Sequence, residues 1–229
     1  MNRTRYSLRK CLKDRLIINV TPATIGFHLG SNLPRMHWIR ELAEKSNNKR
    51  FLSFANKFAY SIEPFLVGDL YFEKSLDITL DLRYQLMEDL IIKRNNIRQS
   101  LIFKQHAYEI SVYGKSNHKN IVLYTENDLI DHINDYLLGL VDSMMGNGYD
   151  TSKSSDVGTC FISPSNQIIK SAAANHRFAV ARILGIKSFP IEVVGISKTL
   201  YSNVKSTKRS MSVTGVIEDI VHKAEMLHQ

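Results

Sequence analysis

The hydrophobic positions between residues 128 and 145 recur every three or four residues, which is the period of an α-helix. They are Leu129, Ile133, Tyr136, Leu137, Leu140, Val141 and Met144. Thr125 and, three residues later, Asp128 form the sequence signature of a capping box, so we expect the helix to begin there. Gly146 and Gly148 predict its end. The aspartates of this segment lie mostly on the other side, and we interpret them as a solvated face and not as metal ligands.

Short apolar runs and helical patterns alternate in the second half of the chain. The turn sequence PSN separates two of these runs, which predicts a hairpin. The expected strands and helices are strands at 121–124, at two places near 158–171 and at 189–194, and helices at 175–184 and about 214–227. This order predicts an α+β fold.

The first half of the chain has mainly helical patterns. Residues 35–60 place Trp38, Phe51, Phe54 and Phe58 near one helical face, and we interpret this aromatic stripe as core. Further helices are expected at 80–94 and in the segment that ends at Gly114. We therefore expect a mainly helical N-terminal region, residues 1–120, packed on a second domain, residues 121–229.

The charge balance favours a negatively charged partner. The 229 residues include 30 Lys and Arg against 22 Asp and Glu, a formal net charge of +8. Such an excess suits nucleic acid or a phosphorylated ligand, although proteins that bind neither also have it. Basic residues concentrate in the first fifteen residues and in 198–209, where we expect a loop that closes over phosphates.

Other classes of protein are not indicated. Cys11 and Cys160 do not form a disulfide framework, and Cys160 is interpreted as a small buried side chain. The chain shows no secretory signal pattern and no run of roughly 18 apolar residues that could span a membrane. We expect a cytoplasmic protein.

The candidate chemistry lies in residues 167–190, QIIKSAAANHRFAVARILGIKSFP. Asn175, His176 and Arg177 stand where an apolar run changes into a helix. Helix N-termini present unpaired N–H groups and bind phosphate readily. Arg177 can bind phosphate with two hydrogen bonds, and His176 can donate a hydrogen bond or move a proton. Asn175 is equally suited to cap the helix, which leaves an anion site and a simple cap as alternatives.

The order strand, turn, strand, small residues and then NHRFAVARILGIKSFPIEVV resembles the ParB/sulfiredoxin superfamily over roughly residues 121–195. Its members have a Gly-x-His/Arg-Arg motif before an Ala-rich helix. Here the usual Gly is Ala174, and Asn175 stands where sulfiredoxins have their catalytic Cys, which puts sulfiredoxin chemistry in doubt. The short segment after Ile196 also argues against the helix-turn-helix module of chromosome-partition ParB proteins.

The resemblance implies a nucleotide held at the helix start, either a nucleoside triphosphate or diphosphate with Mg²⁺. Family members include nucleotide clamps and kinases that act on small molecules, and stand-alone ParB-like proteins are associated with surface-polysaccharide genes. We expect a phosphotransferase that acts on a small molecule or a glycan precursor. The alternatives are a nucleic-acid-binding ParB-like protein and a non-catalytic nucleotide sensor.

Particular residues follow from this expectation. Lys170, Asn175, His176 and Arg177 are the candidates for holding the nucleotide, and His118 with Lys119 could supply another phosphate contact. His176 is also a candidate for proton transfer. Phosphoryl transfer needs a general base, which is commonly a carboxylate. The candidate carboxylates are Glu126, Asp128 and Asp156.

Overall fold

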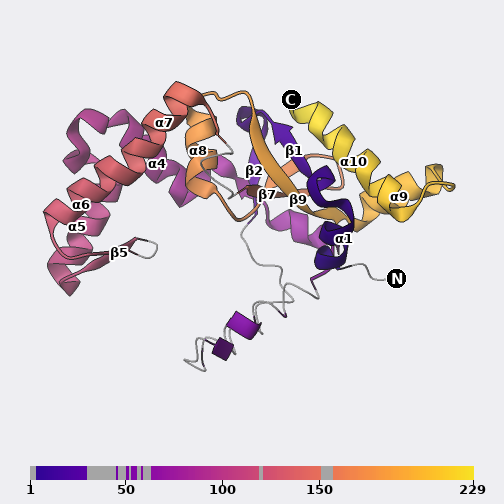
Figure 1. Ribbon diagram of the computed structural model, residues 1–229, viewed down its shortest axis with the longest axis horizontal. Helices are drawn as coiled ribbons and strands as arrows, with labels where there is room; N and C mark the ends of the chain where they lie inside the picture. Colours follow the sequence, from indigo (N-terminus) through magenta and orange to yellow (C-terminus); the bar gives the residue numbers. More distant parts are fainter. Residues whose placement is uncertain are drawn as a thin grey trace.

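The computed structural model describes residues 4–29, 63–118, 121–150 and 157–229, together with residues 45, 50, 51, 53–55 and 58. They form a mixed α and β structure, as the sequence predicts, in which helices flank one main sheet (Figure 1). The strands are β1 (Ile17–Val20), β2 (Phe27–His28), β3 (Leu66–Val67), β4 (Leu76–Asp77), β5 (Ser116–His118), β6 (Ile121–Leu123), β7 (Gly158–Ile162), β8 (Ile168–Lys170) and β9 (Phe189–Ser197).

Helices connect and cover these strands. The α-helices are α1 (Arg5–Leu12), α4 (Leu82–Ile92), α5 (Leu101–Tyr113), α6 (Glu126–His132), α7 (Gly139–Asn147), α8 (Asn175–Ile183), α9 (Lys198–Thr207) and α10 (Val213–His228). The shorter helical segments are η1 (Lys13–Leu16), η2 (Pro22–Thr24), η4 (Asp69–Lys74), η5 (Ile78–Leu80), η6 (Arg94–Gln99) and the π-helical η7 (Ile133–Leu138). The predicted helices near 80–94, 175–184 and 214–227 and the helix ending at Gly114 are confirmed within one or two residues.

The main sheet has the strand order β1-β9-β7-β8-β2-β4, and β3 also pairs with β9. The hairpin β7–β8 is antiparallel, as predicted, whereas β7 is parallel to β9 and β2 is parallel to β8. All nine residues of β9 are buried, and the strand has partners on both edges. Its sequence, FPIEVVGIS, is mostly apolar, as is typical of a strand covered on both faces, and the buried Glu192 is paired with Arg9.

Strands from both sides of residue 120 build this sheet. β1 to β4 precede that residue, and β7 to β9 follow it. The predicted division into residues 1–120 and 121–229 therefore does not coincide with a division of the sheet. Strands as short as β2 and β4 show no alternation from which a sequence could predict them. The strand predicted at 121–124 is β6, which pairs with β5 in a separate hairpin and does not join the main sheet.

The helix predicted from the hydrophobic pattern of residues 128–145 is confirmed. α6, η7 and α7 run without a break from Glu126 to Asn147. The capping box is present: Thr125 Oγ1 accepts a hydrogen bond from the Asp128 N–H at 3.1 Å, and Asp128 Oδ2 accepts one from the Thr125 N–H at 3.0 Å. No helix among the described residues is long and apolar enough to cross a membrane.

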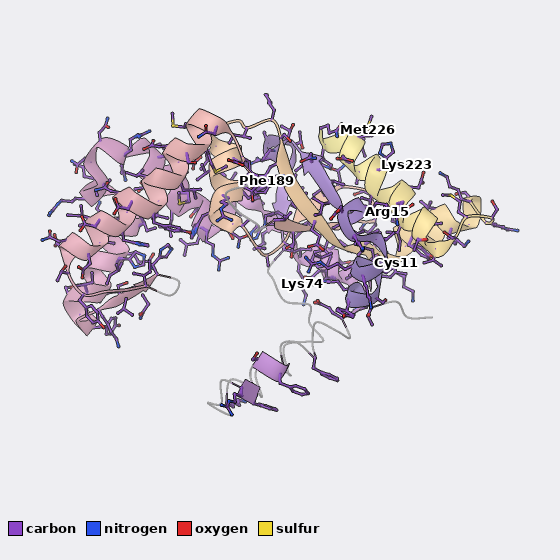
Figure 2. All side chains as sticks on the ribbon, in the orientation of Figure 1. Cys11, Arg15, Lys74, Phe189, Lys223 and Met226 are labelled. Atoms are coloured by element: carbon purple, nitrogen blue, oxygen red, sulfur yellow. The ribbon has the colours of Figure 1, made fainter. Side chains whose placement is uncertain are left out.

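The core lies between the sheet and the helices, and α8 contacts both α4 and α7. Phe178 of α8 meets the ring of Phe189 edge-on, with 5.4 Å between ring centroids. Phe189, the first residue of β9, is labelled in Figure 2, where it lies beside α8. Cys160 is fully buried, as predicted, and burial raises the pKa of its thiol.

The two basic segments contact the protein's own acids. Residues 198–209 form α9 and the turn after it, so the prediction of a loop closing over phosphates is wrong. α9 lies beside α10 and away from α8 (Figure 1). Lys208 Nζ is 2.6 Å from Asp219 Oδ1, and Arg9 Nε of α1 is 2.7 Å from Glu192 Oε1. Arg15 of η1 pairs with Glu218 of α10, the helix that also carries Lys223 (Figure 2).

The aromatic stripe predicted as core is exposed where it is described. Phe51, Phe54 and Phe58 are 46%, 65% and 48% exposed. Trp38 lies outside the described residues. Helical spacing shows which side chains share a face, but it does not show whether that face is buried.

Candidate functional site

The candidate site lies where α4 and α8 begin. β2 and β8 are parallel, so both end at the same edge of the sheet, with His28 and Lys170 as neighbours in register. Residues 171–174 lead from β8 into α8, and η5 leads from β4 into α4. Two helix N-termini therefore meet at the carboxyl ends of two parallel strands, a place where ligands commonly bind.

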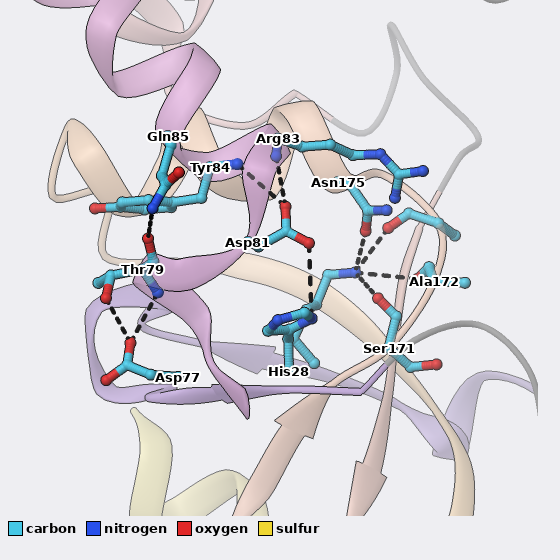
Figure 3. Close-up of polar contacts among 12 residues, drawn as sticks. His28, Asp77, Thr79, Asp81, Arg83, Tyr84, Gln85, Ser171, Ala172 and Asn175 are labelled. Atoms are coloured by element: carbon cyan, nitrogen blue, oxygen red, sulfur yellow. Dashed lines mark hydrogen bonds and ion pairs between the residues drawn. The ribbon is translucent and has the colours of Figure 1, made fainter. Parts of the chain in front are cut away.

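Lys170 organises the turn that precedes α8. Its side chain is buried, and its ammonium group donates to the carbonyl oxygens of Ser171, Ala172 and Ala173 at 2.6, 3.0 and 2.8 Å. Asn175 Oδ1 is a fourth acceptor at 2.9 Å, so the three N–H bonds of the ammonium group are shared among four oxygens (Figure 3). A buried charge needs such partners. Lys170 thus holds the turn in place, and its predicted contact with phosphate is at most indirect.

The turn itself has an unusual backbone. Ala173 and Ala174 have φ values of 64° and 48°, a left-handed conformation that costs alanine about 1–2 kcal/mol. Since the carbonyl groups of residues 171–173 point at Lys170, the N–H on the other side of each peptide plane points away from it. Among the described residues, none accepts a hydrogen bond from the N–H of Ala172, Ala173 or Ala174.

At the start of α8 the N-cap residue supplies no cap. The N-cap position is Ala174, whose methyl side chain cannot accept a hydrogen bond from the first turn. Asn175 lies inside the helix, and its side-chain oxygen Oδ1 accepts a hydrogen bond from Lys170. The alternative in which Asn175 caps the helix is therefore wrong. Because its side-chain oxygen is committed to Lys170, Asn175 does not offset the partial positive charge of the helix start.

A small cavity of about 100 Å³, which we call the inner cavity, lies on one side of this turn. Lys170 and Asn175, two of the predicted ligand-binding residues, line it together with His28, Asp81 and Arg83. No sequence pattern indicated His28 or Asp81. They are far apart in the chain, and only the pairing of β2 with β8 brings His28 to this place.

Asp81 has two roles at the start of α4. Its Oδ1 accepts hydrogen bonds from the N–H groups of Arg83 and Tyr84, at 2.8 and 3.1 Å, and so caps the helix. Its Oδ2 is 3.7 Å from His28 Nδ1 (Figure 3). The other ring nitrogen, His28 Nε2, is buried and has no hydrogen-bond partner among the described residues.

A larger cavity of about 640 Å³, the outer cavity, lies at the first turn of α8. His176 and Arg177, the other two predicted ligand-binding residues, line it. Its remaining polar lining residues are Arg83, Gln105, His106, Asn117, His118, Tyr136 and Asn175. No described residue of this lining is a carboxylate, so the cavity is suited to an anion. Arg83, Ala172 and Asn175 line both cavities, which makes the two neighbours.

Histidines gather on one wall of the outer cavity. The ring centroid of His118 is 5.6 Å from that of His106, 4.9 Å from that of His132 and 5.4 Å from that of His176. His118 Nδ1 and His132 Nε2 are 2.7 Å apart and share a hydrogen bond. In the described part of the chain, no three His, Cys, Asp or Glu residues are arranged to hold a metal ion. The predicted contact of His118 with phosphate is compatible with this position, and Lys119 lies outside the described residues.

The predicted general bases are placed elsewhere. Glu126 pairs with Arg98 at 3.0 Å. Asp128 belongs to the capping box, and hydrogen bonds from the backbone of Tyr124 and Thr125 lower the pKa of its carboxyl group. Neither carboxylate lines the inner or the outer cavity, which argues against both as bases at this site. Asp156 lies outside the described residues.

Comparisons of the chain with protein-family models, with curated proteins and with solved structures found no match. The site is therefore interpreted from its own geometry.

Proposed function

We propose that this protein binds the phosphate groups of a nucleoside triphosphate or diphosphate at the start of α8, in the outer cavity. One observation carries the proposal. A helix start whose N-cap residue, Ala174, has no side-chain acceptor, and whose preceding turn directs its N–H groups away from Lys170, adjoins a cavity lined by Arg83, Arg177 and His176 and by no described carboxylate. Phosphate satisfies unpaired N–H groups and neutralises such a surface.

The residues have separate roles in this proposal. The turn and first-turn N–H groups bind the phosphate oxygens. Arg177 and Arg83 supply planar guanidinium groups that can each donate two hydrogen bonds to phosphate. His176 donates a further hydrogen bond. Mg²⁺ enters bound to the phosphates, because it commonly keeps several water ligands and needs few protein carboxylates.

The resemblance to the ParB/sulfiredoxin superfamily extends the proposal to catalysis. The order β7, β8, turn, α8, β9 agrees with the order on which that resemblance rests. On this basis the protein is a phosphotransferase that acts on a small molecule or a glycan precursor. A sensor that binds nucleotide without turnover would use the same binding residues, and the formation of nucleoside diphosphate distinguishes the two.

Nucleic-acid binding is the less favoured function. The basic residues that suggested it, including Arg9 and Lys208, are paired with the protein's own acids. Sulfiredoxin chemistry is not favoured either. Cys160 is buried, and neither Cys160 nor Cys11 lines the inner or the outer cavity.

The test is nucleotide binding by isothermal titration calorimetry, with ATP, ADP, CTP and GTP in the presence of Mg²⁺. For the nucleotide that binds, Arg177→Ala is expected to raise Kd by about tenfold to hundredfold, since hydrogen bonds to charged groups contribute about 1.5–3 kcal/mol. Arg98→Ala is the matched control, because Arg98 pairs with Glu126 outside both cavities. Failure of every nucleotide to bind, or wild-type affinity in Arg177→Ala, would disprove the proposal.

A further inference from the structure

We infer that the inner cavity is the acceptor site of the proposed phosphotransferase, that it takes the hydroxyl group of a small molecule, and that His28, oriented by Asp81, removes the hydroxyl proton. This inference rests on the proposed function. It assigns the role of general base to His28, in place of the predicted carboxylates Glu126, Asp128 and Asp156.

The first support is the state of the His28 side chain. His28 lines the inner cavity, and its Nε2 is buried without a hydrogen-bond partner among the described residues. A buried polar atom that lacks a partner costs free energy, so it marks a place where a ligand group can restore the hydrogen bond. A substrate hydroxyl donating to Nε2 would do so, with a small shift of the cavity lining, because Nε2 is not exposed to solvent in this structure.

The second support is the carboxylate beside the other ring nitrogen. Asp81 Oδ2 is 3.7 Å from His28 Nδ1, about 1 Å longer than a hydrogen bond, and catalytic hydrogen bonds often tighten only when substrate is bound. Asp81 cannot turn away freely, because its Oδ1 is held by the N–H groups of Arg83 and Tyr84. A carboxylate at Nδ1 favours the tautomer with a proton on Nδ1, which leaves the lone pair on Nε2 to accept a proton.

The third support is the size and position of the cavity. A volume of about 100 Å³ has room for about three water-sized groups, enough for a hydroxymethyl group and too small for a nucleobase. The rest of the acceptor must extend into the outer cavity, with which the inner cavity shares Arg83, Ala172 and Asn175. A hydroxyl at Nε2 would thus adjoin phosphates held at the start of α8.

The proposed step transfers one phosphoryl group. The hydroxyl proton moves to His28 Nε2, and the hydroxyl oxygen forms a bond to the terminal phosphorus of the nucleoside triphosphate. The bond between that phosphorus and the bridging oxygen breaks, and its electron pair leaves with the nucleoside diphosphate. The positive charge of Lys170, fixed at the base of the turn, helps to balance the negative charge nearby. Water serves as the acceptor when no other hydroxyl compound is present.

The test measures ADP formation from MgATP, with water as acceptor, alongside the Kd for MgATP. His28→Gln is expected to lower the rate about 100-fold or more, as removal of a general base does, while Kd changes less than threefold. Asp81→Asn keeps the cap but directs an amide N–H at Nδ1, which moves the ring proton to Nε2. A comparable loss is expected. Asp77→Asn is the control, because Asp77 caps η5 in the same way but does not line the cavity.

The outcomes separate the two proposals. Binding of ATP with no ADP formation by the wild-type protein, or undiminished ADP formation by His28→Gln, would overturn the inference and leave nucleotide binding intact. Failure of ATP, ADP, CTP and GTP alike to bind would overturn the proposed function itself. A measurement without nucleotide adds a separate check: nitrogen NMR of the histidine rings is expected to show His28 protonated on Nδ1 when neutral, and protonation on Nε2 would contradict the role of Asp81.

Discussion

Helices α6 and α8 both begin shortly after a strand, but their first turns are completed in opposite ways. At α6, Thr125 and Asp128 satisfy the helix start through a capping box. At α8, the N-cap residue Ala174 has no side-chain acceptor, and the side chain of Asn175 is committed to Lys170. The first arrangement serves the stability of the helix alone. The second leaves N–H groups and positive charge beside a cavity, which is what an anion-binding site requires.

The cost of the second arrangement is visible in the backbone. Ala173 and Ala174 adopt left-handed conformations that alanine disfavours, and the buried ammonium of Lys170 is what holds them. Strain of this kind persists only where the surroundings impose it, and it is common at functional sites. Substitutions that change one helix start at a time test whether the two differ in this way.

The largest effect is expected from Lys170→Met. The substitution keeps most of the side-chain volume but leaves the carbonyl groups of Ser171 and Ala173 without the lysine donor, whereas Ala172 still accepts hydrogen bonds from Thr159. Buried acceptors left without a donor cost about 1–3 kcal/mol each when they cannot reach water, so the free energy of unfolding should fall by about 3 kcal/mol. Urea denaturation measures it. The exposed Lys10→Met should change it by less than about 0.5 kcal/mol. A loss below about 1 kcal/mol in Lys170→Met would show that the turn does not depend on this lysine.

A smaller effect is expected from Thr125→Ala at the start of α6. Loss of the N-cap oxygen should lower the free energy of unfolding by about 1 kcal/mol. The Kd for nucleotide should stay within twofold of the wild-type value, because Thr125 lines neither cavity. The same urea denaturation and calorimetry apply. If Thr125→Ala weakened nucleotide binding as much as Arg177→Ala does, the ligand would lie at the start of α6. That result would contradict the proposed site at α8.

The smallest effect concerns pH. Backbone N–H groups of Tyr124 and Thr125 hold the pKa of Asp128 below its ordinary value of 3.8. The stability that Asp128 contributes is therefore fully present above pH 3.8 and is lost as the pH falls through the lower folded-state pKa. A carboxyl-carbon NMR titration should show this low pKa in the wild-type protein and a higher one in Thr125→Ala. An Asp128 that titrates at 3.8 or above would show that the capping box does not persist in solution.

The starts of α6 and α8 could be predicted from the sequence to different degrees. The α6 start was predictable because its capping partners lie three residues apart, and the position of α8 was predictable from the change of pattern at Asn175. The hydrogen-bond partner of Asn175 could not be predicted, because an asparagine at this position is equally suited to cap the helix. Only the fold shows that its side-chain oxygen accepts a hydrogen bond from Lys170. His28 and Asp81 meet through strand pairing, which no local spacing reveals.

The two further errors have physical causes. Residues 198–209 were expected to be a loop because of their charge, yet Leu200, Tyr201 and Val204 have helical spacing and pack against the core. The aromatic residues Phe51, Phe54 and Phe58 also have helical spacing, and they are exposed. Helical spacing predicts a helix, but it does not show whether the shared face is buried or exposed.

The most direct test of the central claim is an amide NMR titration of the protein with MgATP. If phosphate binds at the start of α8, the largest shifts should occur at the N–H groups of residues 172–177, and those at the start of α6, residues 125–128, should stay nearly unchanged. Arg177→Ala should reduce these shifts at the same ligand concentration. Saturation with nucleotide that leaves residues 172–177 unshifted would contradict the account.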